Sequence, residues 1–246
     1  MIKSIQINKN RIRKLKNKGI KGFVWTFYDK LLLNVFSIVY YYLNTKIPHP
    51  NKVIWVKVAE IEYMLKKDGD LRKWSFPGSI KDGDWDLNYI AFKDQPKIWD
   101  KRNGIIEHFT NEVPWRDTIY FKKHHDHLQD VCGCTNIDEL VQYYERNIDS
   151  LFDKVKSEGF VSEYEKSNVD PLYVHIGRNG EIFYTRDGQH RLSIAVALGI
   201  EYLPVRVWWR HKQWQEMRCN LSQRNPIHTK SNLKNHPDLQ DIFKNN

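Results

Sequence analysis

The sequence predicts an α+β fold, a small mixed sheet with flanking helices and a basic helical extension on its N-terminal side. Three observations lead to this class. A helical pattern of apolar residues covers 136–159, a pair of strand patterns covers 172–185, and a second helical pattern over 189–198 leads into a strand pattern over 203–209. Helical and strand patterns of apolar residues follow one another within this stretch of the chain. Helices packed on a sheet are the architecture that buries the apolar faces of both.

The first of these helices begins at Asn136 and ends at Gly159. Glu139, three residues after Asn136, completes a pattern that resembles a capping box, in which side chains satisfy free N–H groups of the first turn. Gly159 suits the left-handed residue that ends many helices. The apolar residues recur on one helical face: Leu140, Tyr144, Ile148, Leu151, Phe152 and Val155.

The strands follow in order. Leu172, Val174 and Ile176 alternate with other residues, as in a strand with one buried face. Asn179-Gly180 is a strong signal for a hairpin turn, and "EIFYT", residues 181–185, is the expected return strand. The helix that opens after the loop closes at Gly199, and "LPVRVWW" is one more strand.

The chain divides into four predicted regions. They are a basic arm and aromatic helix (1–50), an aromatic, loop-rich region (51–135), a core (136–215) and a basic tail (216–246). In the second region "VIWVKVA", residues 53–59, is a strand candidate and "EIEYMLKK", residues 60–67, a short helix. From about residue 68 to 134 the pattern favours loops, and the poorly assigned region 51–135 is a candidate insertion in the core domain.

The net charge of +9 is concentrated at the two ends of the chain. Residues 1–22 hold eight Lys or Arg and no acid, and residues 206–246 carry a net +5, which leaves residues 23–205 mildly acidic. This distribution argues against a general nucleic-acid-binding body. With 41% hydrophobic residues the chain is not disordered, and three cysteines are too few for a disulfide scaffold, so the cytoplasm is the expected compartment.

Residues 23–43 form an aromatic, apolar-rich segment directly after the basic arm. Its uninterrupted part, 31–43, is shorter than the about 20 residues that span a bilayer. We expect a helix and favour one that packs on its own domain, with a solvated basic arm. The alternative is a helix on an anionic membrane surface, where the arm would make weak contact with lipid or with DNA.

The stretch "TRDGQHRLSIAVALG" places a polar loop where a helix starts. A helix start offers free N–H groups and a partial positive charge, so the residues from Gly188 through Gln189 and His190 to Arg191 are candidates for binding a phosphate. Arg191 can fork onto phosphate oxygens, and His190 can donate a hydrogen bond or, if charged, a proton. Asp187 can act as a base or hold Mg²⁺. The alternative is that Asp187 merely caps the helix and Arg191 is a surface cation.

At these residues the chain resembles the ParB/sulfiredoxin superfamily. The segments that carry the resemblance are "YVHIGRNGEIFYT", "DGQHRLSIAVALG" and "LPVRVWW", within about residues 136–211. The superfamily includes chromosome-partitioning proteins that bind CTP and DNA, sulfiredoxins that use ATP, and small-molecule serine kinases. Gln189 stands where sulfiredoxins carry a reactive cysteine. Asp187-Gly188-Gln189-His190-Arg191 differs at one position from the Asp-Gly-His-His-Arg motif of the kinase-like members.

The resemblance implies a nucleotide, ATP or ADP with CTP as an alternative, bound with Mg²⁺ at this loop. It implies phosphoryl transfer to a small hydroxyl compound, or nucleotide hydrolysis, with Asp187 and His190 as catalytic residues. Two other functions stay open: a DNA-binding module of the partitioning type or a nuclease, and a non-catalytic nucleotide sensor.

Two further motifs contain metal-capable side chains. "HHDHLQDVCGC" holds three histidines and two cysteines, but its spacing matches no familiar zinc pattern, and we favour exposed loop histidines with small buried thiols. "DGDWDL" holds Asp82, Asp84 and Asp86 without the other ligands of a calcium loop, and a turn at Gly83 with a packed Trp85 is the preferred interpretation.

The stretch "VWWRHKQWQ" sets tryptophans among basic residues. Such aromatic residues can stack on nucleotide bases. They can equally form the end of a buried strand, and the sequence does not separate these two interpretations.

Overall fold

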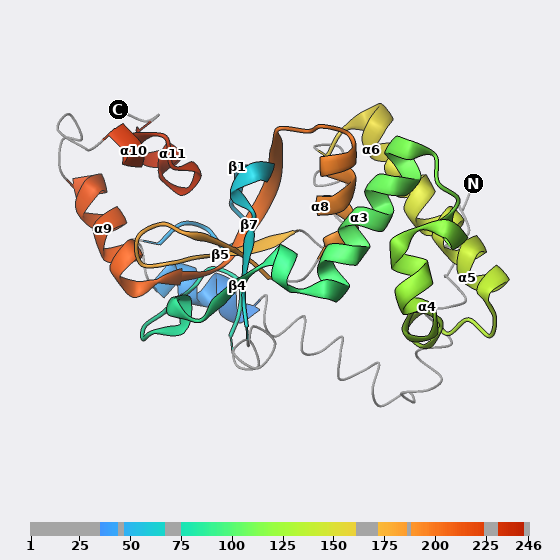
Figure 1. Ribbon diagram of the computed structural model, residues 1–246. Coiled ribbons are helices and arrows are strands. Elements are labelled where there is room, and N and C mark those ends of the chain that lie inside the picture. The colour runs from blue at the N-terminus through green and yellow to red at the C-terminus, as the bar shows by residue number, and fades with distance from the viewer. Residues whose placement is uncertain are drawn as a thin grey trace, which may run out of the picture.

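The computed structural model describes residues 35–43, 47–66, 75–160, 172–185, 188–223 and 231–243. These residues form an α+β fold with a mixed sheet, as the sequence predicts, and the sheet is open and has seven strands. In the view of Figure 1, helices α3 to α6 lie to the right of the sheet and α9 to α11 to its left. Within the described ranges, no helix is both long and apolar enough to cross a membrane.

The sheet has the strand order β1-β7-β5-β6-β2-β4, and β3 pairs with β7 outside this path. The antiparallel pairs are β1 with β7, β5 with β6 and β2 with β4, while β2–β6, β3–β7 and β5–β7 are parallel. The strands are β1 (Val53–Lys57), β2 (Tyr63–Leu65), β3 (Ser79–Lys81), β4 (Tyr89–Ala91), β5 (Tyr173–Ile176), β6 (Ile182–Tyr184) and β7 (Tyr202–His211).

The helices cover the sheet and its ends. They are α3 (Pro96–Asn111), α4 (Ile119–Cys132), α5 (Ile137–Tyr144), α6 (Ser150–Glu158), α8 (Gln189–Ala197), α9 (Lys212–Gln223), α10 (Ser231–Lys234) and α11 (Gln240–Phe243). Short 3-10 turns are η1 (Val58–Glu60), η2 (Trp85–Leu87), η3 (Phe92–Asp94), η4 (Trp115–Asp117) and η7 (Pro237–Leu239), and η5 (Glu145–Asp149) is a π-turn.

Side chains alternate along the strands between two apolar clusters. The larger cluster includes Val174 and Ile176 of β5 and packs against α3 to α6 and α8. The smaller one holds Leu65, Trp85, Phe183 and Trp209. The sheet is therefore covered on both faces, since successive strand residues point to opposite sides.

The predicted helix over 136–159 is confirmed, with one change. The Asn136 side chain caps it by accepting from the Glu139 N–H at 2.9 Å, and Gly159 ends it with a positive φ of 69°. The π-turn η5 joins α5 to α6, so one long helical segment contains an extra residue in its middle. Tyr144 and Ile148 lie buried on the face that the apolar pattern predicts.

The strand predictions for the core are also confirmed. Residues 173–176 and 182–184 form the hairpin β5–β6, with Gly180 at φ 93° in the connecting turn. Strand β7 continues two residues beyond the predicted end, to His211, because β3 pairs with its last residues.

Two predictions in the region 51–135 are wrong. Residues 63–65 of the predicted helix "EIEYMLKK" form strand β2, because they lie between β4 and β6 and hydrogen-bond to both. The stretch 68–134 is not loop-rich where the structure describes it, since α3 and α4 occupy most of 96–132. Tertiary packing outweighs the local preferences here.

Close packing of α4 on α3 depends on Gly104. A Cβ atom at this position would lie 2.6 Å from the Tyr120 Cβ, closer than real contacts allow. Because Gly104 has no side chain, Tyr120 can approach the α3 backbone.

Candidate functional site

Helix α8 begins directly after Gly188, which adopts a left-handed conformation with φ 79°. Glycine enters this region without a steric penalty, so the sequence can turn sharply from the loop into the helix. Gly188 is the N-cap residue, and no side chain caps the helix. Asp187, the predicted base and Mg²⁺ ligand, lies outside the described residues, and its roles stay predictions.

Gln189 and His190, the first two residues of α8, line a cavity of about 340 Å³. Helices α3, α4 and α5 supply most of the other walls. The remaining lining residues are Gln95, Lys97, Ile98, Lys101, Tyr120, His124, His127, Cys132, Tyr143 and Tyr144. We call this space the α8 cavity. The structure thus brings two of the predicted site residues to one cavity, and Arg191 lies next to them outside the lining set.

Lys101 of α3 is the distinctive residue of the α8 cavity. Burial lowers the pKa of its ammonium group to about 8, and a charge on Cys132 would oppose this change. Its Nζ lies 5.8 Å from the centre of the Tyr120 ring. Among the described residues no hydrogen bond or ion pair to a carboxylate compensates the desolvated charge. A cation kept in such a place favours an anion that enters from outside.

His190 is a neutral imidazole in this environment. The pKa of His190 lies well below its ordinary value. Burial is the largest cause, and the positive charges of Lys101 and Arg191 act in the same direction. Its ring packs edge-on against Tyr144, with 6.0 Å between the ring centres. The Nε2 atom is buried and has no hydrogen-bond partner in the part of the chain that the structure describes. A hydrogen-bonding role for His190 therefore fits better than donation of a proton from the charged ring.

Two tyrosines complete the inner wall. Burial raises the pKa of Tyr120 to about 12 and raises that of Tyr144 further, and the two hydroxyl groups share a hydrogen bond. Both side chains therefore stay neutral. They can hydrogen-bond to a ligand without adding a negative charge that would repel a phosphate.

Sequence reasoning missed Lys101 and Tyr120, since both lie in the region where no elements could be assigned. Tyr144 was predicted only as a core residue of the helical face. Nothing in the local sequence marks Lys101, because its desolvation comes from α8 and α4, which are distant in the chain.

The histidine-rich motif lies mainly on helix α4 rather than in a loop. His124 contacts the buried Asp100 of α3, with 2.9 Å between Nε2 and Oδ2, and His125 pairs with Asp126 at 3.0 Å. Cys132 is not in a disulfide. Across the described part of the chain, no group of three histidine, cysteine or carboxylate side chains is arranged to hold a metal.

The acidic motif "DGDWDL" binds an arginine of the chain itself. The Arg178 guanidinium donates to Asp84 at 2.8 Å and to the buried Asp86 at 2.7 Å. Gly83 has φ 92° and Trp85 is buried, which confirms the predicted turn. Arg178 therefore balances the charges of Asp84 and Asp86.

The tryptophan-rich stretch is largely buried. Trp209 and Trp214 are 0% and 1% exposed, and Arg210 and His211 are buried with them. Of the two interpretations, the structure favours the end of a buried strand over a platform for nucleotide bases.

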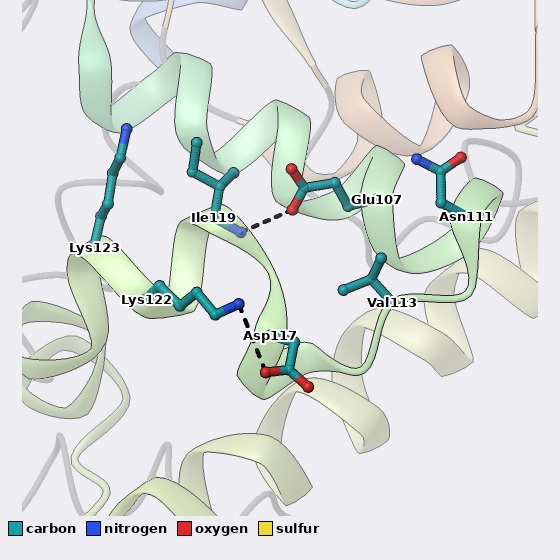
Figure 2. A pocket seen from close by; sticks show the side chains of 7 residues that line it. All are labelled: Glu107, Asn111, Val113, Asp117, Ile119, Lys122 and Lys123. Carbon is teal, nitrogen blue, oxygen red and sulfur yellow. Dashed lines mark hydrogen bonds and ion pairs between the residues drawn. The ribbon is translucent and has the colours of Figure 1, made fainter.

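A second, larger hollow of about 530 Å³ lies between α3 and α4 (Figure 2). Its charged groups have partners within the protein. Glu107 accepts a hydrogen bond from the Ile119 N–H at 2.8 Å, and Lys122 lies 3.7 Å from Asp117. Because these charges have partners within the protein, this hollow has less need of a charged ligand than the α8 cavity.

Comparisons of the chain with protein-family models, curated proteins and solved structures gave no match.

Proposed function

We propose that the α8 cavity binds the phosphate groups of a nucleotide and that the protein transfers a phosphoryl group to a small hydroxyl compound or to water. The observation that carries the proposal is Lys101, a desolvated cation without a carboxylate partner among the described residues, beside the start of α8. A helix N-terminus and a cation together form a favourable seat for a phosphate.

Other residues support the same ligand. The N–H groups of the first turn of α8 lack acceptors within the helix, and Gly188 lets a phosphate approach the backbone closely. His190 can donate a hydrogen bond as a neutral ring. Arg191 is expected to fork onto phosphate oxygens once a ligand is bound. The order of hairpin, helix and strand, here β5, β6, α8 and β7, supports a ParB/sulfiredoxin-like core as part of the proposal.

Magnesium fits the described residues poorly. No carboxylate occurs among the lining residues of the α8 cavity that the structure describes, whereas Mg²⁺ prefers oxygen ligands of this kind. Asp187, which lies outside the described residues, is the one predicted ligand. The proposal therefore assigns no step to Mg²⁺ and rests on Lys101 and the helix start.

Nucleotide binding is tested by calorimetry with ATP, ADP and CTP, with and without MgCl₂. We expect micromolar to millimolar affinity that falls at least about 10-fold in Lys101→Met, because one charge-assisted contact is lost. Lys122→Met is the matched control, since Lys122 lies on α4 in the other hollow and already contacts Asp117. Equal affinities for wild-type protein and Lys101→Met would reject the α8 cavity as the phosphate site.

Turnover separates an enzyme from a sensor. With a radiolabelled nucleotide and a panel of small hydroxyl compounds, the wild-type protein should release or transfer labelled phosphate. Asp187→Asn should lower this rate about 10²-fold if Asp187 is a base. Arg191→Lys keeps the charge but loses the planar fork, so it should weaken binding. Tight binding without turnover would identify a sensor, and tight binding of duplex DNA without nucleotide binding would favour the partitioning-type alternative.

A further inference from the structure

The helix over residues 35–43 exposes its apolar side, whereas a helix that packs on a protein core buries that side. Its nine residues include no charged side chain. Six of them are large and exposed, from 37% for Ile38 to 78% for Leu43. The six are Val35, Phe36, Ile38, Val39, Tyr42 and Leu43.

The exposed residues form one continuous face. With 3.6 residues per turn, they span an arc of about 160° around the helix. The opposite arc carries Ser37, Tyr40 and Tyr41, which contact the protein. Ser37 is buried, the Tyr40 ring lies 5.3 Å from Phe76, and the Tyr41 ring lies 4.9 Å from His49.

The helix therefore docks through its more polar side and presents its apolar side to the surroundings. It appears in blue below the left part of the sheet in Figure 1. Contiguous apolar surface of this kind is rare on a protein that has no partner there.

The sequence next to this helix indicates which partner. Residues 1–22 carry eight Lys or Arg and no acid. A second copy of the chain carries the same positive charge and offers no charge complementarity to these residues. An anionic lipid surface offers both the negative charge that attracts the arm and an apolar layer that accepts Phe36, Val39 and Leu43.

We propose that the protein binds anionic membranes peripherally, with the exposed face of the helix 35–43 inserted at the lipid interface. The positive charge that the sequence places in residues 1–22 adds attraction to anionic headgroups. This surface is independent of the α8 cavity. The apolar face supplies a contribution that salt does not screen, and the arm supplies one that salt does screen.

Vesicle co-flotation tests the proposal with the full chain. Vesicles of phosphatidylcholine with roughly 30% phosphatidylserine should bind the protein, and vesicles of pure phosphatidylcholine should bind it at least about 10-fold less. Raising the salt to about 1 M should weaken the binding to phosphatidylserine vesicles without abolishing it. Equal binding to both vesicle types, or binding to neither, overturns the proposal.

Variants identify the surface. Phe36→Asp combined with Leu43→Asp should lower the affinity for phosphatidylserine vesicles at least about 10-fold, because two carboxylates would have to enter the interface. Leu87→Asp is the matched control, since Leu87 is 61% exposed on η2 and is expected to leave vesicle binding unchanged. A thermal melt confirms that each variant folds.

Two outcomes would contradict the assignment. Unchanged binding in the double variant would show that the helix does not insert. A dimer in sedimentation analysis that the double variant dissociates would assign the face to a second copy of the chain instead. Nucleotide affinity in the α8 cavity should be the same in the double variant, so failure here is distinguishable from failure of the proposed function.

Discussion

Asp238 and Lys101 are both charged side chains whose pKa burial affects strongly, but their surroundings differ. Asp238 is fully buried and accepts from Arg210 Nε at 2.9 Å, from Arg210 Nη2 at 2.6 Å and from Trp214 Nε1 at 3.0 Å. Arg218 donates to the Asp238 carbonyl oxygen and binds Asp241, which also pairs with Lys52 at 2.8 Å. Lys101 has the Tyr120 ring nearby and, in the described ranges, no carboxylate partner.

The pKa directions follow from this difference. Burial alone would raise the pKa of Asp238, but Arg210 and then Arg218 and Lys52 outweigh it and hold the pKa far below its ordinary value. For Lys101, burial is the largest effect and lowers the pKa to about 8. A buried charge with complete partners holds the fold together, whereas a partly buried, desolvated charge without them is a cost in the unliganded protein that a ligand can offset.

The largest expected effect comes from breaking the complete cluster. Asp238→Asn leaves the charge of Arg210 buried without its carboxylate partner, so the free energy of unfolding should fall by about 3–5 kcal/mol. Urea denaturation followed by far-UV circular dichroism measures this loss. Asp84→Asn is the control, because Asp84 is exposed and Arg178 keeps its contact with Asp86, and it should change stability little. Equal losses in the two variants would remove the distinction between paired and exposed acids.

Lys101→Met should act in the opposite direction. Keeping an ammonium group whose pKa falls from 10.5 to about 8 costs on the order of 1–3 kcal/mol, so the unliganded variant should be more stable than the wild type at pH 7. The same variant should lose phosphate affinity. A gain in stability with a loss of binding indicates a functional cation, whereas a loss of stability would indicate a structural role. Denaturation and calorimetry on one preparation decide this.

The pH dependence of stability also tests whether Lys101 is a desolvated cation in the folded protein. Between pH 8 and 10.5 the unfolded chain holds a proton on Lys101 that the folded protein has already released. The contribution of Lys101 to the free energy of unfolding should therefore rise with pH through this window. This rise should be missing in Lys101→Met. The difference between the two denaturation series isolates Lys101 from other groups that titrate there. Phosphate affinity should fall over the same range in the wild type, as Lys101 loses its charge.

The smallest expected effect concerns the glycines at the two ends of α8. Gly188 and Gly199 both have positive φ, 79° and 65°, so Ala at either position should cost about 1–2 kcal/mol. Thermal melts measure this cost. Gly188→Ala should also weaken phosphate binding, while Gly199→Ala, at the far end of the helix, should leave it unchanged. Equal effects of both variants on phosphate binding would show that the phosphate site does not lie at the start of α8.

Local sequence was sufficient for several parts of the fold and of the candidate site. The helix 137–158 follows from a continuous apolar face and a capping residue, Asn136, whose side chain acts within its own first turn. The hairpin follows from Asn179-Gly180, and the start of α8 follows from Gly188. Gln189 and His190 could be predicted as site residues because the end of a helix exposes polar groups wherever it lies.

What the sequence by itself determined is therefore local: the periodic helix, the hairpin, the helix start at Gly188 and the uneven charge along the chain. The tertiary structure alone decided that residues 63–65 become a strand, because β4 and β6 supply their hydrogen-bond partners. It also decided which charges are paired and which are not. Asp238 meets Arg210, and Lys101 comes near the neutral His190, only when segments far apart in the chain pack together. Desolvation and charge pairing depend on distances in space, and no local pattern encodes them.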